Sequence, residues 1–139
     1  MNTKEIQDEI VAEFSMFDDW MERYEYIIEL GKGLPLIAEE YKTEDNIIKG
    51  CQSKVWVHAE EKDGKVFFSS DSDAILTKGI IAILIRAFSN QTPANILEAN
   101  TDFIDEIGLK EHLSATRANG LVSMIKKIKM YALAFEARN

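Results

Sequence analysis

The chain has 139 residues, with 16 lysines and arginines against 24 aspartates and glutamates, and a formal net charge of −8. This length can bury a hydrophobic core without disulfides or metals, so we expect a single domain over residues 1–139. The acidic balance argues against nucleic-acid binding, because contacts with phosphates need surplus lysine and arginine. The apolar run at 79–85 is far shorter than the roughly 20 residues of a membrane-spanning helix.

The N-terminal third predicts two helices. Asn2 followed by Glu5 has the pattern of a capping box, and apolar residues then recur at helical spacing. The aspartates at 18–19 can cap a second helix. We expect Gly31 and Gly33 to end that helix by adopting the left-handed conformation.

A β-hairpin is predicted after a polar loop over residues 42–49. From 53 to 60 the residues alternate between two faces, with Val55, Val57 and Ala59 on one and Trp56 and His58 on the other. Asp63-Gly64 is a strong two-residue hairpin turn. Residues 65–70 then form the returning strand. Trp56, which alternates with valines, is expected in the core.

The second half predicts further helices. An acid or the serine in 71–73 can cap a helix over 74–89, which is apolar nearly all round and should be buried. Short helices are expected after Thr92, with proline at the first position, and over 101–107. The last helix begins near 116–120. Three lysines are expected mostly on its outer face: Lys126, Lys127 and Lys129. The fold class is therefore α+β, with a small antiparallel sheet packed against several helices.

Cys51 is the only cysteine, so it cannot form an internal disulfide. It is packing material, a free nucleophile or a point of attachment for another molecule. Gly50 permits a positive φ beside it, and the polar Gln52 and Ser53 argue against the middle of the core. Chemistry needs the thiolate, so a cation or backbone N–H groups should lower the thiol pKa, at least in the working complex. A single cysteine and no visible export signal indicate a reducing, cytoplasmic setting.

Other chemistries find little support. A Cys–His hydrolase would need His58 or His112, but His58 lies seven positions beyond Cys51, where a regular strand turns the two side chains to opposite sides. A structural zinc site takes four Cys or His ligands, and the chain has three such residues. The acids in 71–73 lack the glycine and distal glutamate of a calcium loop. No metal site and no organic cofactor are therefore expected.

Arg117 is the remaining candidate from the residues alone. It lies near the start of the last predicted helix, where the helix dipole opposes a positive charge. A purely helix-stabilising role is therefore disfavoured, and a solvated surface arginine is the plain alternative.

Six motifs run in order through almost the whole chain. They are YEYIIELG at 24–31, GCQSKVW at 50–56, DSDA at 71–74, KGI at 78–80, HLSATR at 112–117 and NGLVSMI at 119–125. Together they resemble the SufE family of sulfur-acceptor proteins in iron–sulfur cluster assembly, which has CsdE as a close relative. The string around the cysteine is the most specific of the six.

The resemblance implies a fold like that of iron–sulfur scaffold proteins and a sulfur carrier rather than an enzyme. Cys51 matches the cysteine that accepts sulfur from a SufS-type cysteine desulfurase, whose pyridoxal phosphate stays on that partner, and passes it to a scaffold complex. Asp73 and Arg117 match positions near the thiol, as do Gly50 and Gln52 within its motif, and we expect them to organise the thiol loop or docking. The alternative is a docking regulator whose thiol is structural.

Overall fold

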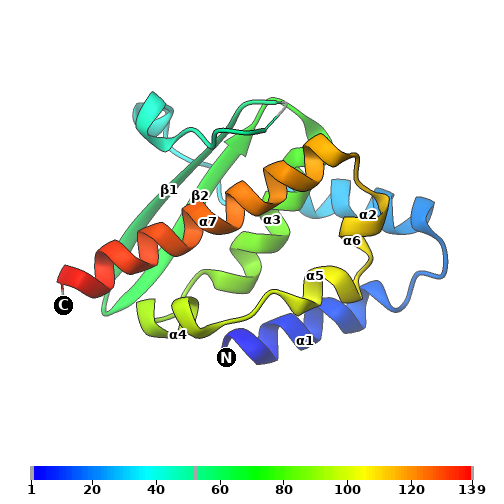
Figure 1. Cartoon of the computed structure of the whole chain (residues 1–139), viewed down its shortest axis with the longest axis horizontal. Coiled ribbons are helices and arrows are strands. Elements are labelled where there is room, and N and C mark those ends of the chain that lie inside the picture. Colours follow the sequence, from blue (N-terminus) through cyan, green and yellow to red (C-terminus); the bar gives the residue numbers. More distant parts are fainter. Residues whose placement is uncertain (1, 52, 139) are drawn as a thin grey trace.

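The computed structural model describes residues 2–51 and 53–138, and of Lys110 the backbone alone. The fold is α+β, as predicted: a hairpin lies against a set of helices (Figure 1). In chain order the elements are α1 Thr3–Phe14, α2 Trp20–Gly31, the 3-10 turns η1 Glu39–Tyr41 and η2 Glu44–Asn46, β1 Val55–Lys62, β2 Lys65–Ser72, α3 Ile75–Phe88, α4 Pro93–Glu98, α5 Asp102–Glu106, α6 Leu109–His112 and α7 Ala115–Arg138. Among the described helices, none is long and apolar enough to cross a membrane.

The hairpin confirms the alternating pattern and the predicted turn. β1 and β2 pair antiparallel, from Val55 opposite Ser72 to Lys62 opposite Lys65. Both turn residues have positive φ, 53° at Asp63 and 78° at Gly64, as a two-residue turn between twisted strands requires. One face of β1 is buried in the core and the opposite face turns outward.

Trp56 lies on that outward face, so its prediction as a core residue is wrong. It is half-buried, and the Lys42 ammonium lies 5.5 Å from the centre of its ring. His58, on the same face, stacks on Tyr41 with ring centroids 3.7 Å apart. The segment before β1 covers this side of the hairpin and supplies these partners.

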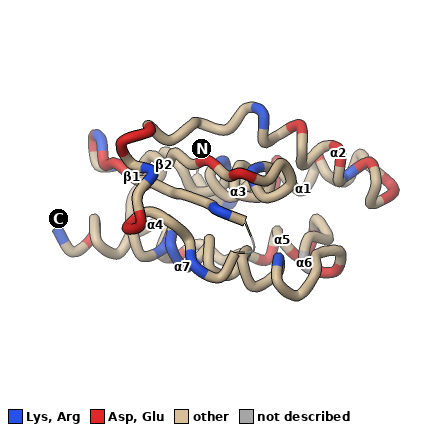
Figure 2. Tube along the Cα trace, turned by 90° about the horizontal axis from the view of Figure 1, so that it is seen from above, with Lys and Arg blue, Asp and Glu red and all other residues tan. Residues whose placement is uncertain are grey.

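α3 is the buried centre that its all-round apolar pattern predicts, with 11 of its 14 residues buried. Seen from above, α7 and α2 lie on opposite sides of it (Figure 2). The crossing with α2 corrects the prediction for Gly31, which is the last residue of that helix and has no positive φ. A Cβ on Gly31 would lie 2.9 Å from the backbone nitrogen of Gly79, and one on Gly79 would lie 2.2 Å from the carbonyl oxygen of Ile27. Close helix packing therefore explains both glycines.

The helix starts are partly as predicted. Asn2 and Glu5 form the capping box of α1, and Asp19 caps α2. The segment 71–73 does not cap α3, whose N-cap Ala74 has no side-chain bond, because β2 continues through Ser72. The Asp71 carboxylate instead pairs with two lysines outside the hairpin: Lys42, in the segment before β1, at 3.0 Å and Lys78 of α3 at 3.5 Å.

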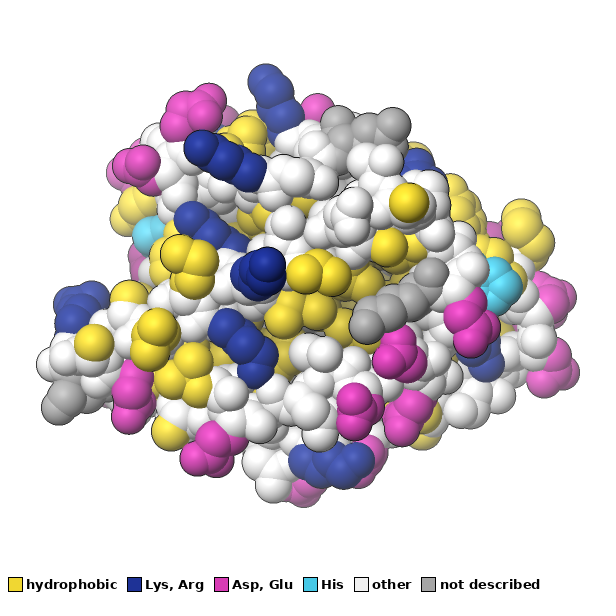
Figure 3. Space-filling view, viewed as in Figure 1, with side chains coloured by type: hydrophobic (Ala, Val, Ile, Leu, Met, Phe, Trp, Pro, Cys, Tyr) yellow, Lys and Arg dark blue, Asp and Glu magenta, His cyan; other side chains and the backbone are white. Residues whose placement is uncertain are grey.

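α7 runs along the hairpin and contributes a buried stripe made of Leu121, Met124, Ile128, Ala132 and Phe135. Lys126 is exposed as expected, and Met130, one turn further along α7, is exposed as well. Figure 3 shows hydrophobic side chains exposed among lysines and arginines on this face of the molecule. Lys129 is not on the outer face. It is half-buried and donates hydrogen bonds to three carbonyls at the end of α4, the shortest to Ala99 at 2.6 Å. Burial lowers its pKa.

Candidate functional site

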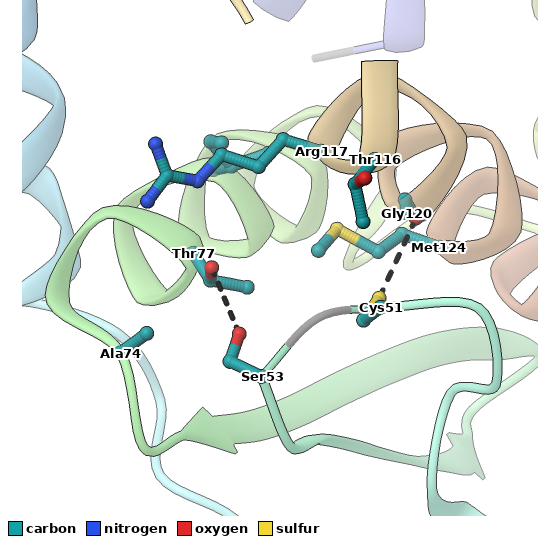
Figure 4. A pocket seen from close by; sticks show the side chains of 9 residues that line it. Cys51, Ser53, Ala74, Thr77, Thr116, Arg117, Gly120 and Met124 are labelled. Atoms are coloured by element: carbon teal, nitrogen blue, oxygen red, sulfur yellow. Dashed lines mark hydrogen bonds between the residues drawn. The ribbon is translucent and has the colours of Figure 1, made fainter. Parts of the chain in front are cut away.

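The Cys51 side chain lines a cavity of about 210 Å³, which lies between the start of β1 and the N-terminal parts of α3 and α7 (Figure 4). The described residues that line it are Cys51, Ser53, Ala74, Thr77, Ile80, Thr116, Arg117, Gly120 and Met124. Three of these side chains carry hydroxyl groups, and one is positively charged. The hairpin and the two helices thus bring together residues that are far apart in the sequence.

The thiol itself is half-buried, and its surroundings favour the neutral form. Its Sγ lies 3.8 Å from the carbonyl oxygen of Gly120, in position to donate a weak hydrogen bond. Burial raises the thiol pKa. Both effects favour the protonated form, because burial desolvates the thiolate and the carbonyl oxygen accepts a hydrogen bond from the S–H group but repels an anion. The free protein therefore does not supply the lowering of the thiol pKa that the chemistry needs, and its supply in the working complex stays a prediction.

The backbone on either side of the thiol is fixed by short contacts. Gly50 has φ +91°, the positive value predicted for it, and a Cβ there would also lie 3.0 Å from the Ser123 Oγ of α7. The Ser53 hydroxyl donates to Thr77 Oγ1 at 3.1 Å, which ties the segment after the thiol to α3. Gln52, between them, lies outside the described residues.

Asp73 lies beside the site without lining the cavity. Its carboxylate accepts a hydrogen bond from the backbone N–H of Lys54 at 3.0 Å, and its own N–H donates to the Lys54 carbonyl at 3.3 Å. The Ser72 hydroxyl donates to that same carbonyl at 2.8 Å. These bonds hold the chain three residues after the thiol.

Arg117 projects from the first turn of α7, and its exposed side chain reaches toward α3 along the cavity (Figure 4). Its backbone N–H bonds to Ser114 Oγ at 3.3 Å. No carboxylate lies within ion-pair distance of it in the described part of the chain. Its positive charge is thus available to an anion that enters the cavity.

The structure brings neither histidine to the cavity. His58 is engaged by Tyr41 and lies 3.3 Å from a carboxylate oxygen of Glu60. His112 stacks on Trp20 with centroids 4.2 Å apart. Among residues 2–51 and 53–138, no three His, Cys, Asp or Glu side chains are grouped so that they could hold a metal ion.

Sequence reasoning missed most of the cavity wall. The cavity wall includes four residues for which the sequence predicts only helical ranges and no role at the thiol: Thr77, Thr116, Gly120 and Met124. Helical spacing shows which residues share a face, but it does not show which face meets a loop dozens of residues away. The only local signal was that a glycine inside a helix is unfavourable and needs a packing reason.

Comparison with known proteins agrees with the geometry. The family described as "SufE: Fe-S metabolism associated domain" matches residues 8–132. An uncharacterized SufE-like protein of Rhizobium meliloti is 42% identical over 130 residues, which cover 90% of this chain and 93% of that protein. A SufE-like protein of Synechocystis is 40% identical over 127 residues, 91% of this chain and 80% of that protein.

The fold has a solved counterpart. The solution structure of a hypothetical protein from Thermus thermophilus superposes with a TM-score of 0.78 and covers 93% of this chain and 94% of that chain. At 20% identity this likeness supports the fold alone. The sequence matches extend over most of the chain, including the segment that carries the thiol, and they place this protein in the SufE family of iron–sulfur metabolism proteins.

Proposed function

We propose that this protein is a sulfur acceptor and carrier in iron–sulfur cluster assembly. Cys51 takes the outer sulfur of the persulfide on a SufS-type cysteine desulfurase and delivers it to a cluster scaffold complex. The observation that carries the proposal is the Cys51 thiol, half-buried at the edge of a cavity that Arg117 overlies. A single cysteine suits a carrier, which holds one sulfur and passes it on, better than a scaffold that must ligate a cluster.

The transfer needs no added oxidant or reductant. The Cys51 thiolate attacks the outer sulfur of the partner's persulfide, forming a new S–S bond while the partner's own S–S bond breaks. The electron pair of the broken bond leaves with the partner's cysteine as a thiolate. The proton from Cys51 goes to that thiolate or to water. Because the product sulfur is removed from the desulfurase, its turnover rises, and this protein acts as an accessory rather than an enzyme.

The neutral thiol of the free protein fits a carrier of reactive sulfur. Thiols react with oxidants as thiolates, so a pKa raised by burial keeps Cys51 inert until it is needed. Docking must then expose the thiol or bring groups that favour its ionisation. The rate of thiol labelling with and without the desulfurase tests this step, and we expect the partner to accelerate it in the absence of cysteine.

The supporting residues act on this thiol in different ways. Asp73 and Gly50 position its backbone through the contacts described above, and Arg117 supplies positive charge where the sulfur anion is formed. The role of Gln52 stays a prediction from the motif. A single domain over 1–139 and a cytoplasmic location also stay predictions from the sequence.

The test is sulfide release by desulfurase and cysteine, with wild type, Cys51→Ser and no added protein. We expect stimulation by the wild type and none by Cys51→Ser, while the variant still competes with the wild type for the desulfurase. If Cys51→Ser stimulates as well as the wild type, the carrier function is wrong and a docking regulator with a structural thiol takes its place.

A further inference from the structure

Gly120 occupies an unfavourable position for a glycine. It is buried in α7, five residues after the helix begins at Ala115. Glycine is the poorest helix former apart from proline. A glycine inside a helix is explained when a side chain there would strike a neighbour, as at the crossing of α2 and α3.

The neighbour of Gly120 is the thiol. A Cβ on this residue would lie 3.0 Å from Cys51 Sγ, 3.6 Å from its Cα and 3.7 Å from its Cβ. Among the described residues, and apart from the neighbouring backbone of α7 itself, these are the three nearest atoms, and all of them belong to the cysteine. The space that the glycine leaves free is therefore occupied by the sulfur.

The next turn of α7 makes a second contact of the same kind. Ser123 lies three residues after Gly120, on the same side of the helix, and its Oγ would be 3.0 Å from a Cβ on Gly50. The Gly50–Cys51 backbone thus lies against α7 at two neighbouring points. A glycine provides the room at each point, one in the thiol loop and one in the helix.

We propose that Gly120 is a positioning residue for sulfur transfer: its missing side chain forms the seat in which the Cys51 thiol rests half-buried. This inference rests on the proposed function of Cys51. Any side chain at position 120 pushes the sulfur away from the Gly120 carbonyl and toward the cavity. The thiol then becomes more hydrated, so its pKa falls toward the ordinary value and its reactivity rises.

Gly120→Ala tests the seat in the free protein, with no desulfurase present. Because each unit of fall in a thiol pKa raises the thiolate fraction about tenfold, we expect iodoacetamide to alkylate the variant about three- to tenfold faster at pH 7. The pH of half-maximal alkylation should fall with it. Gly33→Ala is the matched control: a Cβ there meets nothing closer than the Leu30 carbonyl at 3.7 Å, and the alkylation rate should stay at the wild-type value.

A loss of fold would also expose the thiol, so stability separates the two explanations. Alanine is a better helix former than glycine, which offsets part of the cost of the clash with the sulfur. The melting temperature of Gly120→Ala should therefore stay close to that of the wild type, whereas unfolding of α7 and of the loop that carries Cys51 would lower it strongly. In a Cys51→Ala background the clash with Sγ is gone, and the same substitution should raise the melting temperature more than it does in the wild type. Equal shifts in the two backgrounds, or an unchanged alkylation rate, overturn the inference.

Desulfurase assays then separate this inference from the proposed function. We expect Gly120→Ala to reach the wild-type maximal stimulation at a lower protein concentration, because docking no longer has to unseat the thiol. If Cys51→Ser still stimulates, the proposed function is wrong, while faster alkylation of Gly120→Ala would still establish the seat. If Gly120→Ala alkylates at the wild-type rate and Cys51→Ser is inactive, the seat alone is wrong.

Discussion

Asp73 and the backbone of Lys54 are joined by two hydrogen bonds: the Lys54 N–H donates to the Asp73 carboxylate at 3.0 Å, and the Asp73 backbone N–H donates to the Lys54 carbonyl at 3.3 Å. Lys54 precedes β1 and Asp73 follows β2, so the pair closes the open end of the hairpin. The thiol loop leaves from this closed end and meets α7 at Gly120. The direction in which the thiol points therefore depends on an acid 22 residues away in sequence.

Removing the Asp73 carboxylate should loosen the loop that carries Cys51, between Gly50 and Lys54. We expect Asp73→Ala to lower the free energy of unfolding by about 1 kcal/mol, the usual cost of losing a hydrogen bond, and to speed alkylation of Cys51. Asp73→Asn keeps an acceptor oxygen and should lie closer to the wild type. Asp8→Asn, which removes only the exposed ion pair to Lys4, is the control. Wild-type alkylation of Asp73→Ala would show that the pair does not hold the loop.

Arg117 should matter to transfer and not to folding. Its side chain is exposed and has no ion pair in the described part of the chain, so Arg117→Ala should change stability by less than about 0.5 kcal/mol. Loss of its charge should lower maximal desulfurase stimulation about tenfold, equivalent to roughly 1.4 kcal/mol in the transition state. Arg117→Lys should recover part of it. Arg138→Ala, at the other end of α7, is the control. An equal loss of desulfurase stimulation in Arg138→Ala would show that the charge of Arg117 has no specific role in transfer.

The pKa of Cys51 predicts how the free protein responds to alkali. Burial raises the pKa in the folded state, so the neutral thiol contributes stability below the unfolded pKa of about 8.5, and this contribution is lost as the pH rises through the folded value. The free energy of unfolding of the wild type should therefore fall relative to that of Cys51→Ala as the pH rises from neutral to values above the folded pKa of the thiol. Alkylation should be half-maximal above the pH found for free cysteine. A half-maximal pH at or below that of free cysteine would contradict the seated thiol.

A separate network joins the first three helices. Glu13 accepts hydrogen bonds from the Arg86 guanidinium, one of them at 2.7 Å, and from the Tyr26 hydroxyl. The bond from Arg86 is the main cause of the lowered pKa of Glu13. The stability that this gives is present at neutral pH and is lost as the pH falls below the ordinary glutamate value of about 4.3 and through the folded pKa.

Glu13→Gln should therefore cost about 1 kcal/mol at pH 7, a modest figure because the side chains are partly exposed. The difference from the wild type should shrink as the pH falls below about 4. Glu9→Gln, with a carboxylate 3.9 Å from Arg86, should cost less. A difference from the wild type that persists to the lowest pH at which both proteins fold would show that the charge of Glu13 is not the cause. Alkylation of Cys51 should not change in either variant.

Local chemistry was enough to predict much of the fold. The hairpin follows from period-two alternation and from Asp63-Gly64, and the buried α3 follows from its lack of a polar face. Predictions failed where one element meets another. Gly31 looks like a helix terminator in sequence, but it is explained by Gly79 on a different helix, and Lys129 looks solvated until α4 supplies carbonyls for it.

The candidate site also contains features that local sequence predicts and features that depend on contacts between elements. Cys51 stands out as the only cysteine in a specific motif, and Gly50 beside it has the positive φ that its type suggests. Burial raises the pKa of the thiol in the free protein, and this could not be predicted from the local sequence because the burial depends on where α7 lies. Nothing in the local sequence around 120 indicates that a sulfur from position 51 occupies the space of its missing side chain.

The most direct measurement is the intact mass of this protein after incubation with a cysteine desulfurase and cysteine, followed by mapping of the modified peptide. The account predicts a gain of one sulfur atom on Cys51, reversed by a reducing agent and absent from Cys51→Ser. Unmodified protein during active turnover, or sulfur on a Cys51→Ser variant, would contradict it.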